Sequence, residues 1–399
     1  NPFGWAWDNM QWGHAVSPDM VHWTELPVAI HPHSAGDMVY SGSAVVDKNN
    51  TAGFGKDALV AIYTYHNKKI EDEKTGLHQY QGIAYSTDEG KTWAKYEKNP
   101  VLPNPGIWDF RDPKVQWFEA GKKWVMTLAT KDRITFYSSP NLKQWTKESE
   151  FGEKLGAHGG VWECPDLFSL DFNGQKKWVL LVSINPGGPN GGSATQYFVG
   201  HFDGKTFTPD NMDLRWVDYG SDDYAGVTFS NTGNRKVFMG WMSNWEYAEV
   251  VPTKNWRSAN TIPRDLKLVK VGNDLVLAST PVKELDAITG KPVTLQNISI
   301  NGDYDLSGKI MPYKGKYMVD LQTAGTDDFA LHLTNAKGDD LVIGYEKASN
   351  SFYVDRTKSG DVSFKPIFGK KIVAPRVATS SNISLKVIID VASAEVFAD

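Results

Sequence analysis

Four short polar clusters hold the side chains best suited to chemistry in this sequence of 399 residues. Each cluster precedes an apolar, strand-like run at a similar distance along the chain. The clusters are YSGSA (40–44), FRDP (110–113), WECPD (162–166) and SDDYAG (221–226). Carboxylates beside a guanidinium suit acid/base work on a polyhydroxylated substrate, because Arg and carboxylates bind adjacent hydroxyls while one carboxyl protonates a leaving oxygen.

Glu163 is the candidate acid. It follows Trp162 and precedes Cys164 and Pro165, an apolar setting that favours the protonated carboxyl. Cys164 has no His partner in a recognisable pattern, so we expect a small buried neighbour of Glu163 and not a nucleophile. Spacing alone leaves a second interpretation open, in which Asp112 and Glu163 are ordinary strand-end residues in turns.

Two kinds of sequence segment recur along the chain, an apolar run and a polar turn, and they predict the strands and turns that position these residues. The apolar runs are ALVAIYTY (58–65), KWVMTLAT (123–130), KWVLLVSI (177–184) and KVFMGWMS (236–243). The polar turns are SPDMVHW (17–23), STDEGKTW (86–93), SPNLKQW (139–145) and, in degenerate form, HFDGKTF (201–207). The second turn resembles an Asp-box, in which Ser and Asp bind turn amides and the closing Trp packs between blades. Trp23, Trp93 and Trp145 are therefore expected to be structural.

The repeat predicts a five-bladed β-propeller whose first blade is incomplete. Equivalent positions of successive blades converge on the propeller axis. Ser41, Arg111, Asp112, Glu163 and Asp223 are therefore expected to face one another although they lie far apart in sequence.

The last part of the chain has a different character. Trp-free strands that alternate apolar and polar residues predict a two-sheet β-sandwich. We expect an all-β protein with a propeller over residues 1–270, a linker with a short helix near its end over 271–285, and a sandwich over 286–399.

Composition excludes several classes of function. The net charge is −5 and the 42 basic residues are scattered, which disfavours nucleic acid and anionic membranes as partners. No apolar run is long enough to span a bilayer. The His residues lack the spacing of a metal site, and the Gly run NPGGPNGGS (185–193) does not open a helix, so we expect neither a metal nor a cofactor.

Several motifs in this order resemble glycoside hydrolase family 32, the β-fructofuranosidases that include invertases, inulinases and levanases. They are WGHAVSPDMVHW, YSGSA, FRDP, WECPD, DYAGVTFSN, GWMSNW, VPTKNWRS and IPRDL. The resemblance implies a five-bladed propeller followed by a β-sandwich. It also implies retaining hydrolysis of a terminal β-fructosyl bond in a fructan (levan or inulin) or sucrose.

The same resemblance implies roles for individual residues. Glu163, in the Glu-Cys motif, would be the general acid/base, and Asp112, in the Arg-Asp-Pro motif, would stabilise the transition state. Substrate-binding positions are Arg111, Ser41, Trp7, Trp245, Tyr224 and Asp223, the last two in a motif of less certain role.

The family's nucleophile is an Asp in an Asn-Asp-Pro-Asn-Gly-like motif, which does not occur in this sequence. The chain also ends inside the family's closing Glu-Val-Phe motif. Both features indicate a piece of a longer protein, which as printed is expected to bind fructose weakly and turn over poorly. We expect the whole protein to be extracellular or periplasmic, with the sandwich as a candidate surface for a homodimer.

Three alternatives stay open at this point. A fructosyltransferase would share the first chemical step but use a sugar acceptor. The arabinan-cleaving propellers also use three carboxylates, although Trp5, Trp7 and Trp12 beside WGHA favour the fructosidase. A non-catalytic fructan-binding protein would result if the aspartate were absent from the complete gene.

Overall fold

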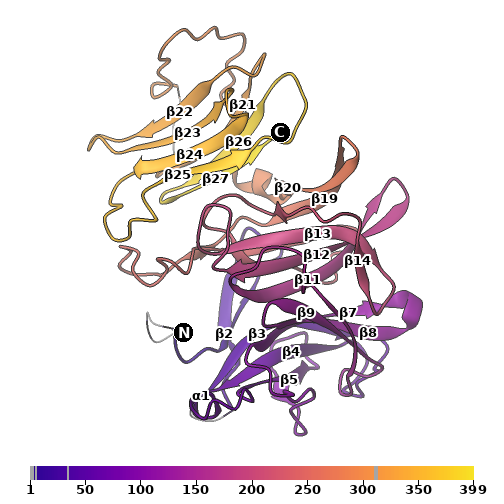
Figure 1. Cartoon of the computed structure of the whole chain (residues 1–399). Helices are drawn as coiled ribbons and strands as arrows, with labels where there is room; N and C mark the ends of the chain where they lie inside the picture. The colour runs from indigo at the N-terminus through magenta and orange to yellow at the C-terminus, as the bar shows by residue number, and fades with distance from the viewer. Residues whose placement is uncertain (1–3, 5–6, 34–35, 310–312) are drawn as a thin grey trace.

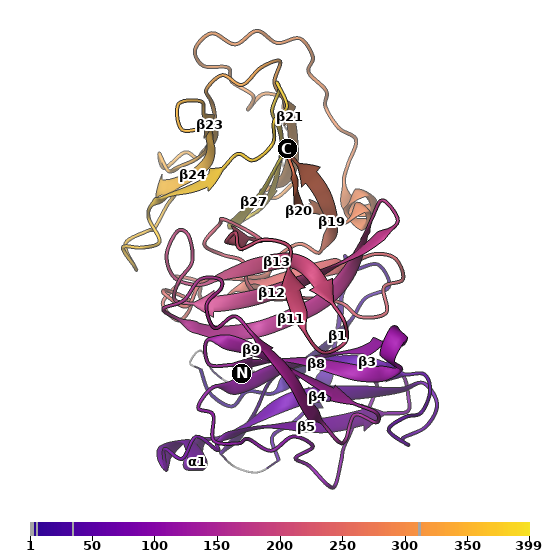
Figure 2. The same ribbon diagram turned by 45° about the vertical axis from the view of Figure 1, so that its right-hand side comes forward.

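The protein is built almost entirely of β-strands, as the sequence predicts. The computed structural model describes residues 4, 7–33, 36–309 and 313–399. Seven sheets form two domains, an N-terminal propeller and a C-terminal sandwich that lies against it (Figures 1 and 2). Trp5, one of the three tryptophans that favour the fructosidase, lies outside the described residues.

Five sheets of antiparallel strands make up the propeller. The first has two described strands, β1 (Trp12–Val16) and β2 (Thr24–Ile30). The second contains β3 (Asp37–Asp47), β4 (Ala58–Asn67), β5 (Gln79–Ser86) and β6 (Ala94–Lys95). The third contains β7 (Phe110–Phe118), β8 (Lys123–Thr130), β9 (Arg133–Ser139) and β10 (Thr146–Phe151).

The fourth sheet contains β11 (Val161–Phe172), β12 (Gln175–Asn185), β13 (Ala194–Phe202) and β14 (Phe207–Pro209), with β15 (Arg215–Trp216) paired to β13. The fifth contains β16 (Tyr224–Thr228), β17 (Val237–Met242), β19 (Arg264–Val271) and β20 (Asp274–Pro281), with β18 (Ala259–Asn260) paired to β17. Five blades with a short first blade agree with the repeat in the sequence.

The sandwich consists of two sheets. One is ordered β21 (Lys316–Gln322), β26 (Ser384–Asp390) and β27 (Ser393–Ala398). The other is ordered β22 (Phe329–Thr334), β23 (Asp340–Glu346), β24 (Ser351–Lys358) and β25 (Lys371–Pro375). Helical structure among the described residues is limited to α1 (Lys68–Asp72) and the 3-10 turns η1 (Glu119–Gly121) and η2 (Lys283–Ile288).

The expected linker over 271–285 was wrong in its first part. Asp274–Pro281 pairs along its whole length with β19 and forms the outer strand of the last propeller sheet. The segment is a hairpin because Gly272, in the left-handed conformation (φ 60°), permits a tight reversal at Val271–Asp274. The expected short helix follows it as η2.

Apolar layers between neighbouring sheets hold the blades together. Phe110, Met126 and Leu128 of the third sheet are fully buried against Val60 and Ile62 of the second. Similar layers join the third sheet to the fourth and the fourth to the fifth. The sandwich has its own core, in which Ile343 and Leu385 come from opposite sheets. Burial of these large side chains, worth about 1.5–3 kcal/mol each, fixes the blades around the axis.

The polar turns have the hydrogen bonds that the Asp-box pattern predicts. Asp88 accepts from Ser86 Oγ and the Thr92 amide, and the Trp93 indole donates to the Gly90 carbonyl. The turns at Asp19 and Asn141 repeat this arrangement. Trp93 and Trp145 pack into the apolar layers, whereas Trp23 closes its turn but stays 43% exposed, since the first sheet has only two described strands to cover it.

Candidate active site

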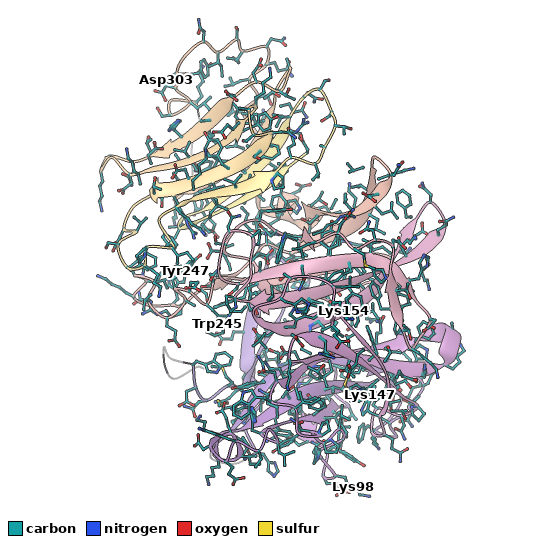
Figure 3. All side chains as sticks on the ribbon, viewed as in Figure 1. Lys98, Lys147, Lys154, Trp245, Tyr247 and Asp303 are labelled. Carbon is teal, nitrogen blue, oxygen red and sulfur yellow. The ribbon has the colours of Figure 1, made fainter. Side chains whose placement is uncertain are left out.

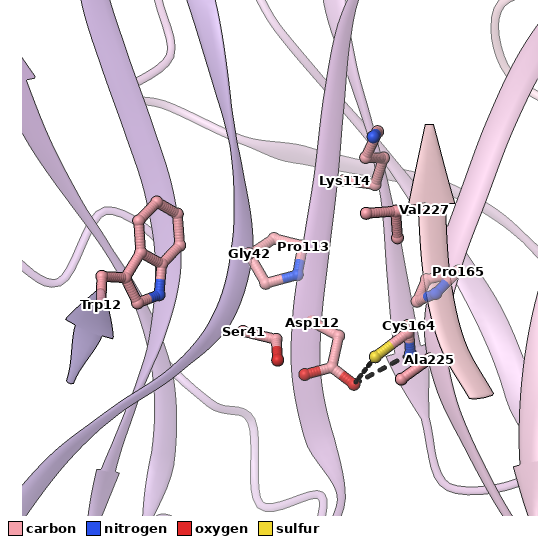
Figure 4. A pocket seen from close by; sticks show the side chains of 10 residues that line it. All are labelled: Trp12, Ser41, Gly42, Asp112, Pro113, Lys114, Cys164, Pro165, Ala225 and Val227. Carbon is pink, nitrogen blue, oxygen red and sulfur yellow. Dashed lines mark hydrogen bonds between the residues drawn. The ribbon is translucent and has the colours of Figure 1, made fainter. Parts of the chain in front are cut away.

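A pocket opens where strands of all five blades meet on the propeller axis. It encloses about 220 Å³. Its lining residues are Trp12, Ser41, Gly42, Asp112, Pro113, Lys114, Cys164, Pro165, Ala225 and Val227 (Figure 4). These come from β1, β3, β7, β11 and β16, which is the convergence that the propeller predicted.

The same irregularity shapes four of the five strands that line the pocket, β3, β7, β11 and β16. The pairing register shifts at Val39/Gly42, Arg111/Lys114, Glu163/Asp166 and Tyr224/Val227. Each shift places two residues opposite one residue of the neighbouring strand, which is a β-bulge. The polar clusters precede the apolar strands, as predicted. They lie on the inner strands and not in turns, except that SDDYAG begins just before β16.

Three bulges place a non-glycine residue in the left-handed region. Asp112, Cys164 and Ala225 have φ values of 64°, 45° and 55°. Such conformations cost on the order of 1–3 kcal/mol each and persist only where the surroundings enforce them, often at functional sites. Their recurrence at one pocket favours function over ordinary strand ends, the second interpretation of Asp112 and Glu163.

Glu163 lies among donors and not in an apolar setting. Its Oε1 accepts from Arg111 Nη2 at 3.0 Å and from Nε at 3.3 Å, and its Oε2 accepts from the Tyr224 hydroxyl. The Trp162 indole points elsewhere and donates to the Ala157 carbonyl. The expected apolar surroundings were wrong, because successive side chains of a strand point to opposite faces.

Arg111 joins the carboxylates of the site. Its guanidinium binds Glu163 on one side and Asp109 on the other. The side chain is 13% exposed, and the nearby carboxylates Glu163, Asp112 and Asp109 raise the pKa of Arg111 against the effect of burial. The charge on Arg111 is thus permanent.

Asp112 lies deeper in the pocket, and only 6% of it is exposed. Its Oδ2 accepts from the Cys164 amide at 2.9 Å and from the Cys164 thiol at 3.5 Å (Figure 4). Burial raises the pKa of Asp112, and the charge of Glu163 adds to this, while Arg111 opposes it. Burial and the same carboxylates raise the pKa of the Cys164 thiol, which suits a hydrogen-bond donor and not a nucleophile.

Ser41 faces Asp112 across the pocket in Figure 4. Tyr224 is buried and reaches the site through its hydroxyl on Glu163. Both positions were predicted, and the structure brings both to the pocket or to its acid.

Trp7 and Trp245 form part of an aromatic row beside the pocket and do not line it. The Trp7 ring is 5.2 Å from that of Trp245 and 5.5 Å from that of Tyr40. Trp245 lies 5.1 Å from Trp241, which in turn packs on Tyr224. Trp7 is 49% exposed, so its face is open to a sugar ring.

Asp223 is not in the pocket, which corrects its prediction as a substrate-binding residue. Its carboxylate is 4% exposed and accepts from Arg264 at 2.9 Å. Asp223 precedes Tyr224 directly, so the alternation of side chains sends one toward the sandwich and the other toward Glu163.

Sequence reasoning missed several residues of the site. Asp109 binds Arg111, and Trp12 and Lys114 line the pocket. Trp12 donates to the Tyr40 carbonyl at 2.9 Å. Lys114 directly follows FRDP, so the similar position of the four clusters in successive blades could have predicted it as a site residue. No local feature of the sequence distinguishes Trp12 from its neighbours.

Comparison with known proteins gives this arrangement a family. Residues 1–281 match the glycosyl hydrolases family 32 N-terminal domain, and residues 284–399 match the family 32 C-terminal domain. The chain belongs to glycosyl hydrolase family 32. The resemblance read from the motifs is confirmed, and with it a propeller followed by a β-sandwich as the fold.

Family 32 relatives match the whole chain. A levanase of Bacillus subtilis is 47% identical over 414 residues, covering 100% of this chain and 60% of the levanase. An extracellular exo-inulinase of Aspergillus niger is 40% identical over 437 residues, covering 100% and 81%. The crystal structure of exo-inulinase from Aspergillus awamori superposes with a TM-score of 0.87 at 37% identity, covering 100% and 84%. The chain thus spans less than two thirds of the levanase.

The described residues contain neither a cluster of metal ligands nor a membrane-spanning helix. No group of three or more His, Cys, Asp or Glu side chains in the described ranges is arranged to hold a metal ion. No helix in this part of the chain is long and apolar enough to cross a membrane.

Proposed function

We propose that the protein is a retaining glycoside hydrolase that releases terminal β-D-fructofuranosyl units from a fructan, levan or inulin, or from sucrose. The observation that carries this proposal is the cluster of Arg111, Asp112 and Glu163, in which Asp112 lines the pocket and Arg111 binds Glu163 directly beside the lining residue Cys164. Membership of family 32, and relatives named levanase and exo-inulinase, support the fructosyl substrate.

Glu163 takes the role of general acid/base. As an acid it protonates the oxygen that leaves with the aglycone, and as a base it removes a proton from the incoming water. Both of its oxygens are bound in the free site, one by Arg111 and one by Tyr224. The glycosidic oxygen must therefore displace one of these donors to reach the carboxyl.

Asp112 stabilises the positive charge that develops on the fructosyl ring, and Arg111 beside it binds the hydroxyls of the sugar. A carboxylate held by the Cys164 amide is fixed in place before the substrate arrives, and such preorganised charge is the largest single contribution in many enzymes. Ser41 supplies a further hydroxyl, and Trp7 and Trp245 offer apolar faces at the rim.

Retaining hydrolysis also needs a nucleophile, and the described residues supply candidates for the other two roles only. Every test therefore uses the full-length protein. Extracellular relatives support secretion, and the sandwich stays a candidate surface for a homodimer.

The decisive test is the variant Glu163→Gln, assayed by fructose release from levan, inulin and sucrose. Loss of the transferable proton is expected to lower kcat about 100-fold or more while fructose still binds. Glu148→Gln is the matched control, because Glu148 is a half-buried carboxylate of β10 that binds Lys123 and Ser138.

Each outcome separates the proposal from its alternatives. Near-normal turnover by Glu163→Gln would refute the acid role. A wild-type protein that binds fructan without releasing fructose would be a binding protein, and one that builds longer oligosaccharides at high sucrose would be a fructosyltransferase.

A further inference from the structure

Asp222, Asp223 and Tyr224, three consecutive residues where β16 begins, contact three different partners. Tyr224 donates to the acid Glu163, next to the pocket-lining Cys164. Its two predecessors, Asp222 and Asp223, bind arginines at the junction between the propeller and the sandwich. The residue that holds the acid is therefore tied, within two residues of chain, to the second domain.

The first tie passes through Arg264 of β19. One nitrogen of its guanidinium, Nη1, donates to Asp223 at 2.9 Å and to Asp218 at 2.8 Å. The other, Nη2, donates at 2.8 Å to Glu395, which lies on β27 of the sandwich. Arg264, Asp223 and Glu395 are exposed by 4%, 4% and 8%, so water does not weaken these contacts.

Glu395 also fixes the backbone of the propeller. Its second oxygen accepts from the Ile262 amide at 2.9 Å. Ile262 lies between β18 and β19, the two strands that pair with β17. One sandwich carboxylate thus positions both the guanidinium that holds Asp223 and the chain beside it.

The second tie passes through Arg356 of β24 in the sandwich. Its Nη1 donates to Asp222 at 2.6 Å and its Nη2 to the Tyr247 hydroxyl at 2.9 Å, while Tyr247 donates to Asp222 at 2.7 Å. The Tyr247 ring also contacts Phe368 of the sandwich at 5.2 Å. Tyr247 lies two residues after Trp245, and Figure 3 shows it at the junction, with Trp245 on the propeller side.

We propose that the sandwich positions residues of the catalytic site. Glu395 is a positioning residue that holds Tyr224 on Glu163, and Arg356 is a positioning residue that holds Trp245 at the rim of the pocket. The proposal rests on the proposed hydrolase function. Removing one partner of a buried ion pair leaves an unpaired charge, and the nearby strand shifts to relieve it. A shift of about 1 Å at Tyr224 is enough to lower turnover strongly.

A double-mutant cycle on the full-length protein tests the first tie. We expect Glu395→Gln to lower kcat for sucrose about tenfold with KM changed less than about twofold, because it disturbs the acid and not the bound ground state. In combination with Tyr224→Phe, we expect no further loss beyond Tyr224→Phe alone, since both changes act through one hydrogen bond. Additive losses, or an unchanged kcat, would overturn the proposal.

A matched control separates positioning from stability. Arg376 is a buried sandwich arginine whose partners, Asp399 and Ser380, belong to the sandwich itself. Arg376→Gln should lower the melting temperature without lowering kcat at 25 °C. If it lowers kcat as Glu395→Gln does, the effect is general destabilisation and the proposal fails. Arg356→Lys replaces Glu395→Gln in the cycle if the latter does not fold.

The second tie is tested by binding, which does not depend on turnover. Fructose affinity is measured by tryptophan fluorescence for Arg356→Lys, Trp245→Ala and their combination. Non-additive losses support the tie between Arg356 and the rim, and additive losses or unchanged binding by Arg356→Lys overturn it. A wild-type protein that releases no fructose refutes the proposed hydrolase, and this cycle then still decides the inference about the sandwich.

Discussion

Arg111 is the residue on which the charges of the site depend. One guanidinium binds Asp109 and Glu163, and it opposes the burial that raises the pKa of Asp112. Arg111→Lys keeps the positive charge but loses the planar fork that serves two carboxylates at once. Since a hydrogen bond to a charged group contributes about 1.5–3 kcal/mol, we expect kcat/KM for sucrose to fall about 10- to 100-fold.

Arg133→Lys is the control for this change. Arg133 also binds carboxylates, Asp132 and Glu150, but on the outer part of the third blade. Its replacement should leave kcat/KM within about twofold, as for most exposed ion pairs. If Arg111→Lys changes kcat/KM as little as Arg133→Lys does, Arg111 contributes its positive charge and not its planar geometry.

At single positions, the sequence identified the residues that share a local motif. FRDP and WECPD carry Arg111, Asp112 and Glu163, and the structure brings all three together. The sequence did not show to which side of its strand each side chain points. Asp223 and Tyr224 are neighbours in one motif, yet they face opposite sides of the strand, because the bulge in β16 begins at Tyr224.

Among the elements, the repeated β-bulge is the device that makes the pocket. It depends on close backbone approach as well as on side chains. A Cβ added at Gly42, in the bulge of β3, would lie 2.0 Å from the Ile62 carbonyl oxygen of β4. Neither strand can move without disturbing the next blade, so we expect Gly42→Ala to lower the free energy of unfolding by about 1–3 kcal/mol in urea titrations.

Gly13→Ala is the matched control in the same propeller. No atom lies within 4 Å of a Cβ at Gly13, a residue of β1. This variant should leave the free energy of unfolding within about 0.5 kcal/mol of the wild-type value. A similar loss in both variants would mean that glycine is needed for flexibility and not for space.

Elements were more predictable than their boundaries. The four apolar runs became the second strands β4, β8, β12 and β17, because an apolar strand between two others needs no long-range information. The bulges could not be predicted, since they follow from the packing of five blades around one axis. The outer strand β20 was taken for a linker because it is only half-buried, so its apolar pattern is weak.

For the whole molecule, the junction between propeller and sandwich carries an unusual set of charges. Arg264 binds Asp218, Asp223 and Glu395 together. Burial raises the pKa of Asp223 to about 8, and the charges of Asp218 and Glu395 add to this against the pull of Arg264. Arg264 lowers the pKa of Asp218 against the effect of burial, so the two neighbouring carboxyls titrate in different ranges.

The raised pKa of Asp223 predicts how stability depends on pH. Between its unfolded pKa near 4 and its folded pKa of about 8, the folded protein binds one more proton than the unfolded chain. The free energy of unfolding therefore decreases as pH rises through this range, by about 1.4 kcal/mol per pH unit at most. Asp223→Asn removes the titrating group, so urea titrations from pH 5 to 8 should give a flatter dependence than the wild type. Asp213→Asn, at an exposed ion pair with Arg215, should keep the wild-type slope. A wild-type slope in Asp223→Asn would place the titration on another group of the junction.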